Sequence, residues 1–230
     1  MSLIADLCNI LLPRKCVVCQ HTLEPTEQYI CAACSIQLPR YPIESIEDNE
    51  PLRKVWNYAP IQYGATLLYY RHQSSFHNII IKIKYKGGVQ LGIRIGEWAA
   101  MEIAPLQLAK QIDVIVPVPA DRKRKKRRGY NQAELIAKGM AKIMNRPVLN
   151  LLEKKDTGTS QTKLSQTARR ENTTGKYIAT IPDTWRGKHI LLVDDVLTTG
   201  ATIGNCAQAL LACDPEARIS IFSLAYNAES

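Results

Sequence analysis

Two adjacent carboxylates near the C-terminus are the residues of this chain best suited to chemistry. Asp194 and Asp195 follow the apolar residues 190–193 and precede a threonine- and glycine-containing turn over residues 198–202. Carboxylate oxygens accept hydrogen bonds from sugar hydroxyls and bind hydrated Mg²⁺. The order of residues predicts a buried strand, an acid pair, a short turn and then a helix, which is an arrangement suited to a phosphorylated sugar.

The turn after the acid pair is predicted to bind the phosphate. Unpaired N–H groups and a partial positive charge at a helix N-terminus attract anions, whereas the two acids would repel a phosphate. A glycine lets the backbone approach a ligand closely, and threonine hydroxyls add donors. The alternative is that the acids only cap the helix, but capping explains one acid and not two. The candidate phosphate-binding residues are Thr198, Thr199, Gly200, Ala201 and Thr202.

Four cysteines near the N-terminus have the spacing of a metal site. Cys16 and Cys19 form one Cys-x₂-Cys pair, and Cys31 and Cys34 form another. Four thiolates suit tetrahedral Zn²⁺ and leave no open position, so we expect a structural ion. A module of about 40 residues is too small to be stable alone, and zinc would stabilise it. The alternative is a chance set of reduced thiols, because cytosolic proteins rarely form disulfides.

The charge of the chain is uneven. Thirty basic and 21 acidic residues give a formal net charge of +9, and seven consecutive cations occupy residues 122–128. Such a block is usually a solvated loop. Seven cations nevertheless exceed what one small phosphate ligand needs, so we predict that this loop binds single-stranded DNA. Lys82, Lys84, Lys86 and nearby tyrosines (Tyr69, Tyr70, Tyr85 and Tyr130) would extend the surface. The candidate DNA-binding residues are Arg122, Lys123, Arg124, Lys125, Lys126 and Arg127.

Strands and helices are predicted to alternate over most of the chain. Strands are expected at 112–118, 188–193 and 217–225, and helices at 76–83, 91–109, 130–144 and 201–213. Residues 56–70 are β-prone with a turn at Gly64, and residues 42–54 are expected to form a linker or entry loop. Alternation predicts a parallel sheet with helices on both faces, where ligands bind beyond the carboxyl ends of the strands.

The cellular location is predicted to be the cytoplasm. No run of residues is apolar enough for a membrane span, and the first 13 residues lack the basic start of an export signal. We expect those 13 residues to form a short amphipathic helix.

The acid pair and its turn resemble the phosphoribosyl-pyrophosphate signature of type I phosphoribosyltransferases. Further segments at 116–119, 128–132, 161–165 and 169–172 resemble the ComF family of competence-linked proteins. The resemblance implies an α/β, parallel-sheet type I phosphoribosyltransferase-like fold with a small N-terminal zinc module that uses four cysteine ligands. The module would span residues 1–45 and the phosphoribosyltransferase-like domain residues 46–230.

The resemblance also implies ligands and partners. Asp194 and Asp195 would contact the ribose of phosphoribosyl pyrophosphate, which binds with Mg²⁺. Residues 120–129, including Arg128 and Gly129, would hold pyrophosphate. A closing loop over residues 156–175 would bring Arg169 and Arg170 to the ligand. A helicase of the kind associated with ComF proteins would be a partner.

Three functions are compatible with these features. We favour a ComF-like protein of DNA uptake or recombination that binds phosphoribosyl pyrophosphate and single-stranded DNA. The alternatives are a catalytically active phosphoribosyltransferase of nucleotide metabolism and a zinc module that serves only protein contacts. A transferase needs a base-recognising hood, and we find no place for one after the strand at 217–225. Whether catalysis takes place is left open.

Overall fold

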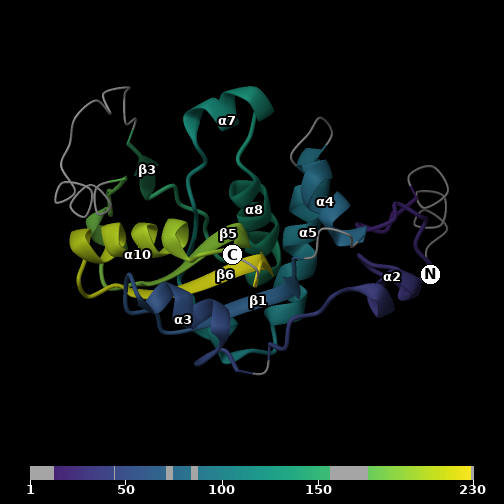
Figure 1. The fold of residues 1–230 in the computed structure, drawn as a ribbon, viewed down its shortest axis with the longest axis horizontal. Coiled ribbons are helices and arrows are strands. Elements are labelled where there is room, and N and C mark those ends of the chain that lie inside the picture. The colour runs from purple at the N-terminus through teal and green to yellow at the C-terminus, as the bar shows by residue number, and fades with distance from the viewer. Residues whose placement is uncertain (1–12, 44, 71–74, 84–87, 156–175, 229–230) are drawn as a thin grey trace.

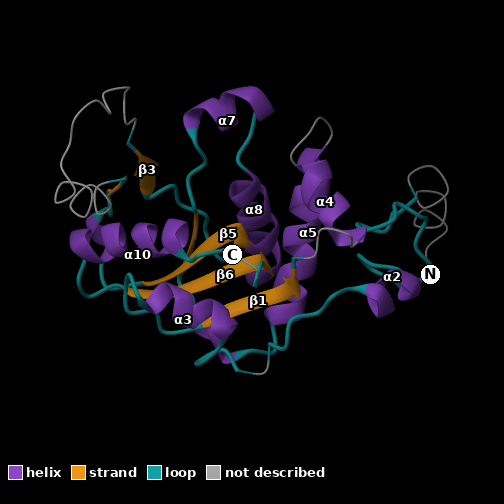
Figure 2. Ribbon diagram, in the orientation of Figure 1, coloured by secondary structure: helices purple, strands orange, loops and turns teal. Residues whose placement is uncertain are grey.

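The protein is built around one parallel sheet. The computed structural model describes residues 13–43, 45–70, 75–83, 88–155 and 176–228. Four strands pair in parallel in the order β1-β6-β5-β2. Figures 1 and 2 show β1, β6 and β5 side by side. This confirms the predicted α/β fold with a parallel sheet. The strands are β1 (Gly64–Tyr69), β2 (Val114–Pro117), β5 (His189–Leu197) and β6 (Arg218–Tyr226).

Helices cover both faces of the sheet, as alternation of the strand side chains requires. In β5, Leu191 and Val193 point to one core, whereas Ile190 and Leu192 point to the other. The first core is covered by α4 (Ser75–Ile83), α5 (Gly88–Ile103), α6 (Gln107–Gln111) and α8 (Gln132–Met144), and the second by α3 (Glu50–Trp56) and α10 (Ala201–Cys213). Among the described residues, no helix has the length and apolar character needed to cross a bilayer.

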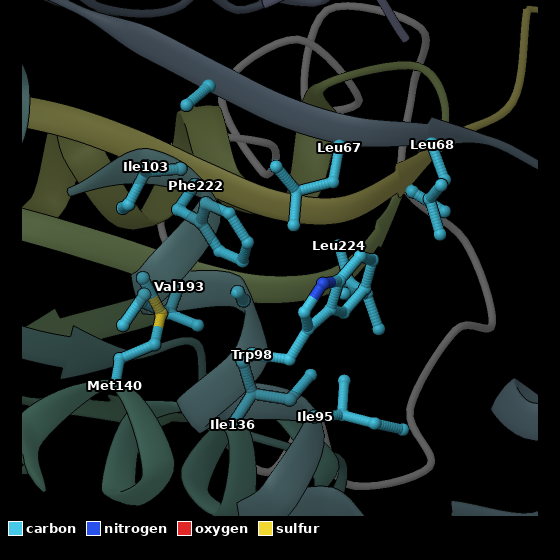
Figure 3. Close-up of a cluster of buried hydrophobic side chains, with 14 of the residues drawn as sticks. Leu67, Leu68, Ile95, Trp98, Ile103, Ile136, Met140, Val193, Phe222 and Leu224 are labelled. Atoms are coloured by element: carbon cyan, nitrogen blue, oxygen red, sulfur yellow. The ribbon is translucent and has the colours of Figure 1, made fainter. Parts of the chain in front are cut away.

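The first core joins the sheet to α5 and α8. Figure 3 shows Trp98 of α5 and Met140 of α8 lying below Phe222 of β6. The two helices approach each other at glycines: a Cβ on Gly96 would meet the Ile136 carbonyl oxygen at 2.1 Å, and one on Gly139 would meet the Ile93 carbonyl oxygen at 2.0 Å. This close packing fixes α8, whose N-terminus reaches the candidate site.

The basic run is a helix and not the predicted loop. The helix α7 (Arg122–Arg128) begins after Asp121, whose side chain accepts a hydrogen bond from Lys123 N, and ends at Gly129, which has a positive φ of 85°. Lysine and arginine have good helix propensity, and a capped start with a glycine end is enough to close two turns. α7 stands above the carboxyl ends of the strands (Figure 1).

The expected linker over residues 42–54 is wrong in its last part. α3 begins at Glu50, with Asn49 as N-cap accepting from Leu52 N and Pro51 in the first turn. Leu52 and Val55 are buried in the second core, which draws this segment into the fold. Similarly, Gly64 starts β1 and is not a turn within a strand.

Two further differences concern element boundaries. The predicted helix over 91–109 is two helices, α5 and α6, and the predicted strand over 188–193 continues to Leu197. The sequence does not predict the short antiparallel pair of β3 (Leu152–Lys154) and β4 (Tyr177–Ala179), because three-residue strands carry too little periodicity. Among the described residues, the elements not yet mentioned are the short helix α2 (Ala32–Gln37) and a 3₁₀ turn over Asp183–Trp185.

A buried histidine makes the stability of the fold depend on pH. His189 begins β5 fully buried, with its Nε2 2.8 Å from the Ser220 hydroxyl. Burial, helped by the charge of Arg218, lowers the pKa of His189 to about 4, although Asp113 acts in the opposite direction. Since the unfolded histidine has a pKa of about 6.5, the unfolded state binds more protons between about pH 6.5 and 4, so stability is lost as pH falls through that window.

We therefore expect His189→Gln to flatten the acid side of the stability curve. When the pH falls from about 7.5 to about 4.5, the wild type should lose about 2.5 kcal/mol more of its free energy of unfolding than the variant loses. Urea unfolding of both proteins at the two pH values measures this difference. If the free energies of unfolding of wild type and variant differ by the same amount at both pH values, His189 titrates normally in the folded protein.

Candidate functional site

The candidate site is a cavity of about 300 Å³ at the carboxyl edge of the sheet. It lies where β2 leaves β5: the ladder between them ends at the Pro117–Val193 pair, and β5 continues alone beside β6. The chain after β2 turns away through Val118 and Asp121, which line the cavity together with Asp194. The sheet therefore opens a gap beside the acid pair, as expected for a parallel sheet.

Asp194 and Asp195 lie in this cavity, half-buried and within β5. The pairing of Asp194 with Ser223 and of Val196 with Ala225 holds this part of the strand. Each carboxylate accepts one backbone hydrogen bond at 2.8 Å, Asp194 from Asp195 N and Asp195 from Val196 N. Neither acid is turned into the core, and both line the cavity.

The predicted phosphate turn leads into α10 with an open N-terminus. Gly200 has a φ of 77° and is the N-cap residue, so no side chain caps the helix from that position. The two neighbouring helices of this edge do have side-chain caps, Asp121 for α7 and Asn131 for α8. An added Cβ on Gly200 would lie 3.0 Å from the Lys54 backbone. A glycine is thus required here, and it leaves α10 N–H groups for an anion.

The threonines of the turn differ in position. Thr198, Thr199 and Thr202 are exposed, and Thr202 lines the cavity. The Thr199 hydroxyl accepts a 3.4 Å hydrogen bond from Ala201 N. The other four turn residues are not among the residues of the cavity wall.

Four further residues of the wall were not singled out from the sequence: Asp121, Gln132, Lys154 and Tyr177. Lys154 Nζ lies 3.3 Å from Asp121 Oδ2, and Arg128 donates a 3.0 Å hydrogen bond to Gln132 Oε1. Asp121 and Gln132 lie within two segments that the sequence did mark, 120–129 and 128–132. Lys154 and Tyr177 come from the unpredicted β3–β4 pair.

Two of these residues, Tyr177 and Gln132, offer hydrogen-bond donors to the cavity. Burial raises the pKa of Tyr177 to about 12, and Cys206 and Asp194 act in the same direction, so its hydroxyl stays protonated at neutral pH. Gln132 is 5% exposed, and its Nε2 has no hydrogen-bond partner among the described residues. A buried amide without a partner is costly, and a ligand oxygen in the cavity would satisfy it.

The cavity has mixed charge. Three carboxylates line it, those of Asp121, Asp194 and Asp195, against two cations, Arg128 and Lys154. An anionic ligand would meet an excess of negative charge unless a divalent cation came with it. Oxygen donors of this kind fit Mg²⁺.

The basic helix α7 connects the cavity to the surface. Arg128 is half-buried and lines the cavity, whereas the described side chains before it on the helix are exposed. Gly129 is outside the wall and ends the helix. The residues described as exposed on α7 are Arg122, Lys123, Lys125, Lys126 and Arg127.

The four cysteines of the N-terminal pairs come together. The Sγ atoms of Cys16, Cys19, Cys31 and Cys34 all lie within 4.8 Å of one another, and those of Cys19 and Cys31 are 3.8 Å apart. A tetrahedral Zn²⁺ with Zn–S bonds of about 2.3 Å needs sulfur atoms about 3.8 Å apart. The site can hold a metal ion.

The surroundings of Cys16 favour a thiolate. Burial opposes ionisation, but the N–H groups of Cys31, Cys19 and Val18 outweigh it and lower the pKa of Cys16 to about 7. Val18 N and Cys31 N each lie 3.4 Å from its sulfur. Hydrogen bonds to the sulfur of a ligand are a common feature of metal-thiolate sites, because they stabilise its charge.

Several predicted residues lie outside the described residues. Arg169 and Arg170, with the whole closing loop over 156–175, belong to this group, as do Lys84, Tyr85 and Lys86. Within α7, the backbone of Arg124 is described but its side chain is not. These predictions stay as the sequence made them.

Comparisons with known proteins identify the family of this chain. A model of the phosphoribosyl transferase domain family matches residues 95–230, which include β2, β5, β6 and every residue of the cavity wall. The allosteric regulatory enzyme of purine biosynthesis, a solved structure, is similar with 19% identity and a TM-score of 0.42, covering 61% of this chain and 29% of that one.

Curated relatives were also found by sequence, and three of them are described here. Competence protein ComFC of Bacillus subtilis is 33% identical over 111 residues, covering 48% of this chain and 43% of the relative. Competence protein F of Haemophilus influenzae is 35% identical over 100 residues (43% of this chain, 44% of the relative). DNA utilization protein YhgH of Escherichia coli O6:H1 is 32% identical over 100 residues, covering 43% of each.

These matches span less than half the length of each relative, but the family model covers more than half of this chain. The resemblance noted in the sequence is confirmed: the chain belongs to the phosphoribosyl transferase domain family and is a ComF-family protein with a phosphoribosyltransferase-like domain.

Proposed function

We propose that the cavity binds phosphoribosyl pyrophosphate together with Mg²⁺. The observation that carries this proposal is the placement of two half-buried carboxylates and an uncapped helix N-terminus beside one cavity. Asp194 and Asp195 would accept hydrogen bonds from the ribose hydroxyls. The turn of Thr198 to Thr202 would hold the 5′-phosphate through its N–H groups and hydroxyls.

The pyrophosphate would bind on the opposite side of the cavity. Arg128 and Lys154 are its cations, and the buried Nε2 of Gln132 offers a further donor. Magnesium would balance the carboxylate charge, held by Asp194 and Asp195 together with ligand oxygens. Arg169 and Arg170 are proposed to join from the segment outside the described residues.

Calorimetric titration tests this proposal. We expect one equivalent of phosphoribosyl pyrophosphate to bind in the presence of Mg²⁺, and at least about tenfold weaker binding when Mg²⁺ is removed. Ribose 5-phosphate and pyrophosphate, each of which fills half of the site, should bind more weakly than the whole ligand. No heat of binding with any of the three would refute the proposal.

The second part of the proposal is that α7 binds single-stranded DNA in DNA uptake or recombination. The helix stands at the top of the view in Figure 1, and its described side chains other than Arg128 are exposed cations. The relatives are named for competence and DNA utilization, and this naming supports a DNA partner for the present chain. Lys125 and Glu134 are 4.0 Å apart, a weak exposed contact that a phosphate could replace.

Binding through this surface should depend strongly on salt. If about five cations contact phosphates, log Kd should rise with log salt concentration at a slope of roughly 3.5. Fluorescence anisotropy with a labelled single-stranded oligonucleotide from about 50 to 300 mM salt measures the slope.

Replacing Lys125, Lys126 and Arg127 by Gln should reduce the slope to about 1.5. Replacing Lys110, Lys138 and Lys142 by Gln is the matched control, since it removes the same charge from elsewhere and should leave the slope unchanged. A slope near zero in the wild type, or an equal loss in both triple variants, would end the DNA proposal.

The metal of the cysteine site is proposed to be structural zinc, because four sulfur ligands leave no position for a substrate. The division at residue 45, a helicase partner and a cytoplasmic location stay predictions from the sequence.

Transfer of the phosphoribosyl group to an acceptor is the second candidate function, which the family match favours. Release of pyrophosphate on addition of an acceptor base, and only then, would establish it.

A further inference from the structure

We propose that the sugar-phosphate cavity and the basic helix α7 are coupled, so that a ligand in the cavity weakens the binding of a nucleic acid to α7 and the reverse. The inference rests on the proposed function of both sites. It concerns their mutual regulation, which neither the family match nor the relatives' names describe.

The coupling begins with the two ends of α7, because each end is tied to a residue of the cavity wall. At the start, Asp121 accepts a hydrogen bond from Lys123 N through Oδ1, while its Oδ2 lies 3.3 Å from Lys154 Nζ. At the end, Arg128 donates to Gln132 Oε1. Asp121, Arg128, Gln132 and Lys154 all line the cavity.

An anionic ligand would compete for these same contacts. Arg128 and Lys154 are the two cations of the wall, so phosphate oxygens would draw both toward the cavity. The Lys154–Asp121 pair is partly exposed, with side chains 34% and 39% accessible, and such a pair is weak enough to exchange. The ligand would thereby take the Lys154 ammonium away from the residue that caps α7.

Arg128 is the residue that both ligands need. It is the last residue of α7, continuous with the exposed cations, and it is also in the cavity wall. A guanidinium that neutralises a pyrophosphate contributes little to binding a nucleic-acid backbone.

Distance adds a second, general effect. A helix of seven residues is about 10 Å long, so every exposed cation of α7 lies close to a residue of the cavity wall. The screening length at physiological salt is about 8 Å, and a multiply charged ligand in the cavity therefore lowers the positive potential of α7. Both effects have the same sign, so binding at the two sites is antagonistic.

Competition between ligands on the whole protein tests this. At constant ionic strength, saturating phosphoribosyl pyrophosphate with Mg²⁺ should raise the Kd of a single-stranded oligonucleotide about five- to tenfold. The oligonucleotide should raise the Kd of phosphoribosyl pyrophosphate by the same factor, as linkage requires. Sulfate at equal ionic strength is the control for screening.

Substitutions of two neighbouring arginines distinguish a specific role of Arg128 from a general loss of positive charge. Arg128→Gln should reduce the coupling factor to below about two, because the shared cation is gone. Arg127→Gln removes one charge from the exposed part of α7 and should keep the factor of the wild type. Equal factors in the two variants would overturn the role of Arg128.

The double variant Asp194→Asn, Asp195→Asn tests whether phosphoribosyl pyrophosphate acts from the cavity or directly on α7. It should bind the oligonucleotide at least as tightly as the wild type, because two negative charges of the cavity are gone, and it should show no antagonism at ligand concentrations that saturate the wild type. Persistent antagonism would mean that phosphoribosyl pyrophosphate competes directly on α7, and the inference would fail.

The failure of this inference is distinguishable from that of the proposed function. If either ligand does not bind alone, the proposed function fails with it. If both bind but each Kd is unchanged or lowered by the other ligand, the proposed function stands and the coupling is wrong.

Discussion

Replacing Asp194 and Asp195 by Asn is expected to weaken binding of phosphoribosyl pyrophosphate by at least about 100-fold. A hydrogen bond to a charged group contributes about 1.5–3 kcal/mol, and two such bonds to the ribose hydroxyls would be weakened together. The substitution also removes two candidate oxygen ligands of Mg²⁺ in their charged form. Calorimetric titration of wild type and double variant measures the loss.

The substitution is suited to this test because it changes charge and little else. An Asn at position 194 can still accept the hydrogen bond from the N–H of residue 195, and both positions are half-buried in a paired strand. Asp183→Asn is the matched control, an acid that is 97% exposed at its side chain and outside the cavity wall. Equal affinity in the double variant and the control would show that the acid pair does not hold the ligand.

Loss of one cysteine ligand is expected to remove the metal and to destabilise more than the N-terminal segment. Cys19→Ser should reduce bound zinc from one ion per chain to a small fraction. Structural zinc sites contribute about 10–16 kcal/mol in small peptides. If only about 3 kcal/mol of this is lost here, Tm should fall by about 6–12 °C.

The reason for a global effect is packing. Cys16, Val17 and Val18 are buried in the same core as the residues of β1 and α5, and Arg94 of α5 donates a 2.6 Å hydrogen bond to the Lys15 carbonyl. Cys213→Ser provides the control, a partly buried cysteine outside the cluster. Metal analysis and thermal unfolding decide the matter: full zinc content in the Cys19 variant would contradict a four-cysteine site.

The sequence predicts those parts of the fold in which apolar periodicity is long. The helix over 201–213 has its predicted ends, and the strands over 112–118 and 217–225 are within two residues of β2 and β6. These segments are buried on one face or both, so hydrophobicity alone marks them. α7 could not be predicted this way, because a helix of seven cations has no apolar face and depends on its two end residues.

The sequence predicts one wall of the candidate cavity better than the other. The wall built by β5 and the start of α10 is continuous in sequence, so one motif names it. The other wall joins Asp121, from the segment 120–129 that the resemblance marked, to Lys154 and Tyr177, which lie far from it along the chain. Tertiary packing brings Lys154 and Tyr177 to this wall, and no local pattern in a single sequence announces them.

The departure of β2 at Pro117 has a consequence for ligand selection. On one side of the opening, hydrogen bonding to β6 keeps the acid-bearing backbone in place before anything binds, so little ordering entropy is lost there. The facing side rests on two strands of three residues each, with far fewer bonds to restrain it. Tolerance toward related compounds should therefore evolve through substitutions around Lys154 and Tyr177, while the strand carrying the carboxylates changes little.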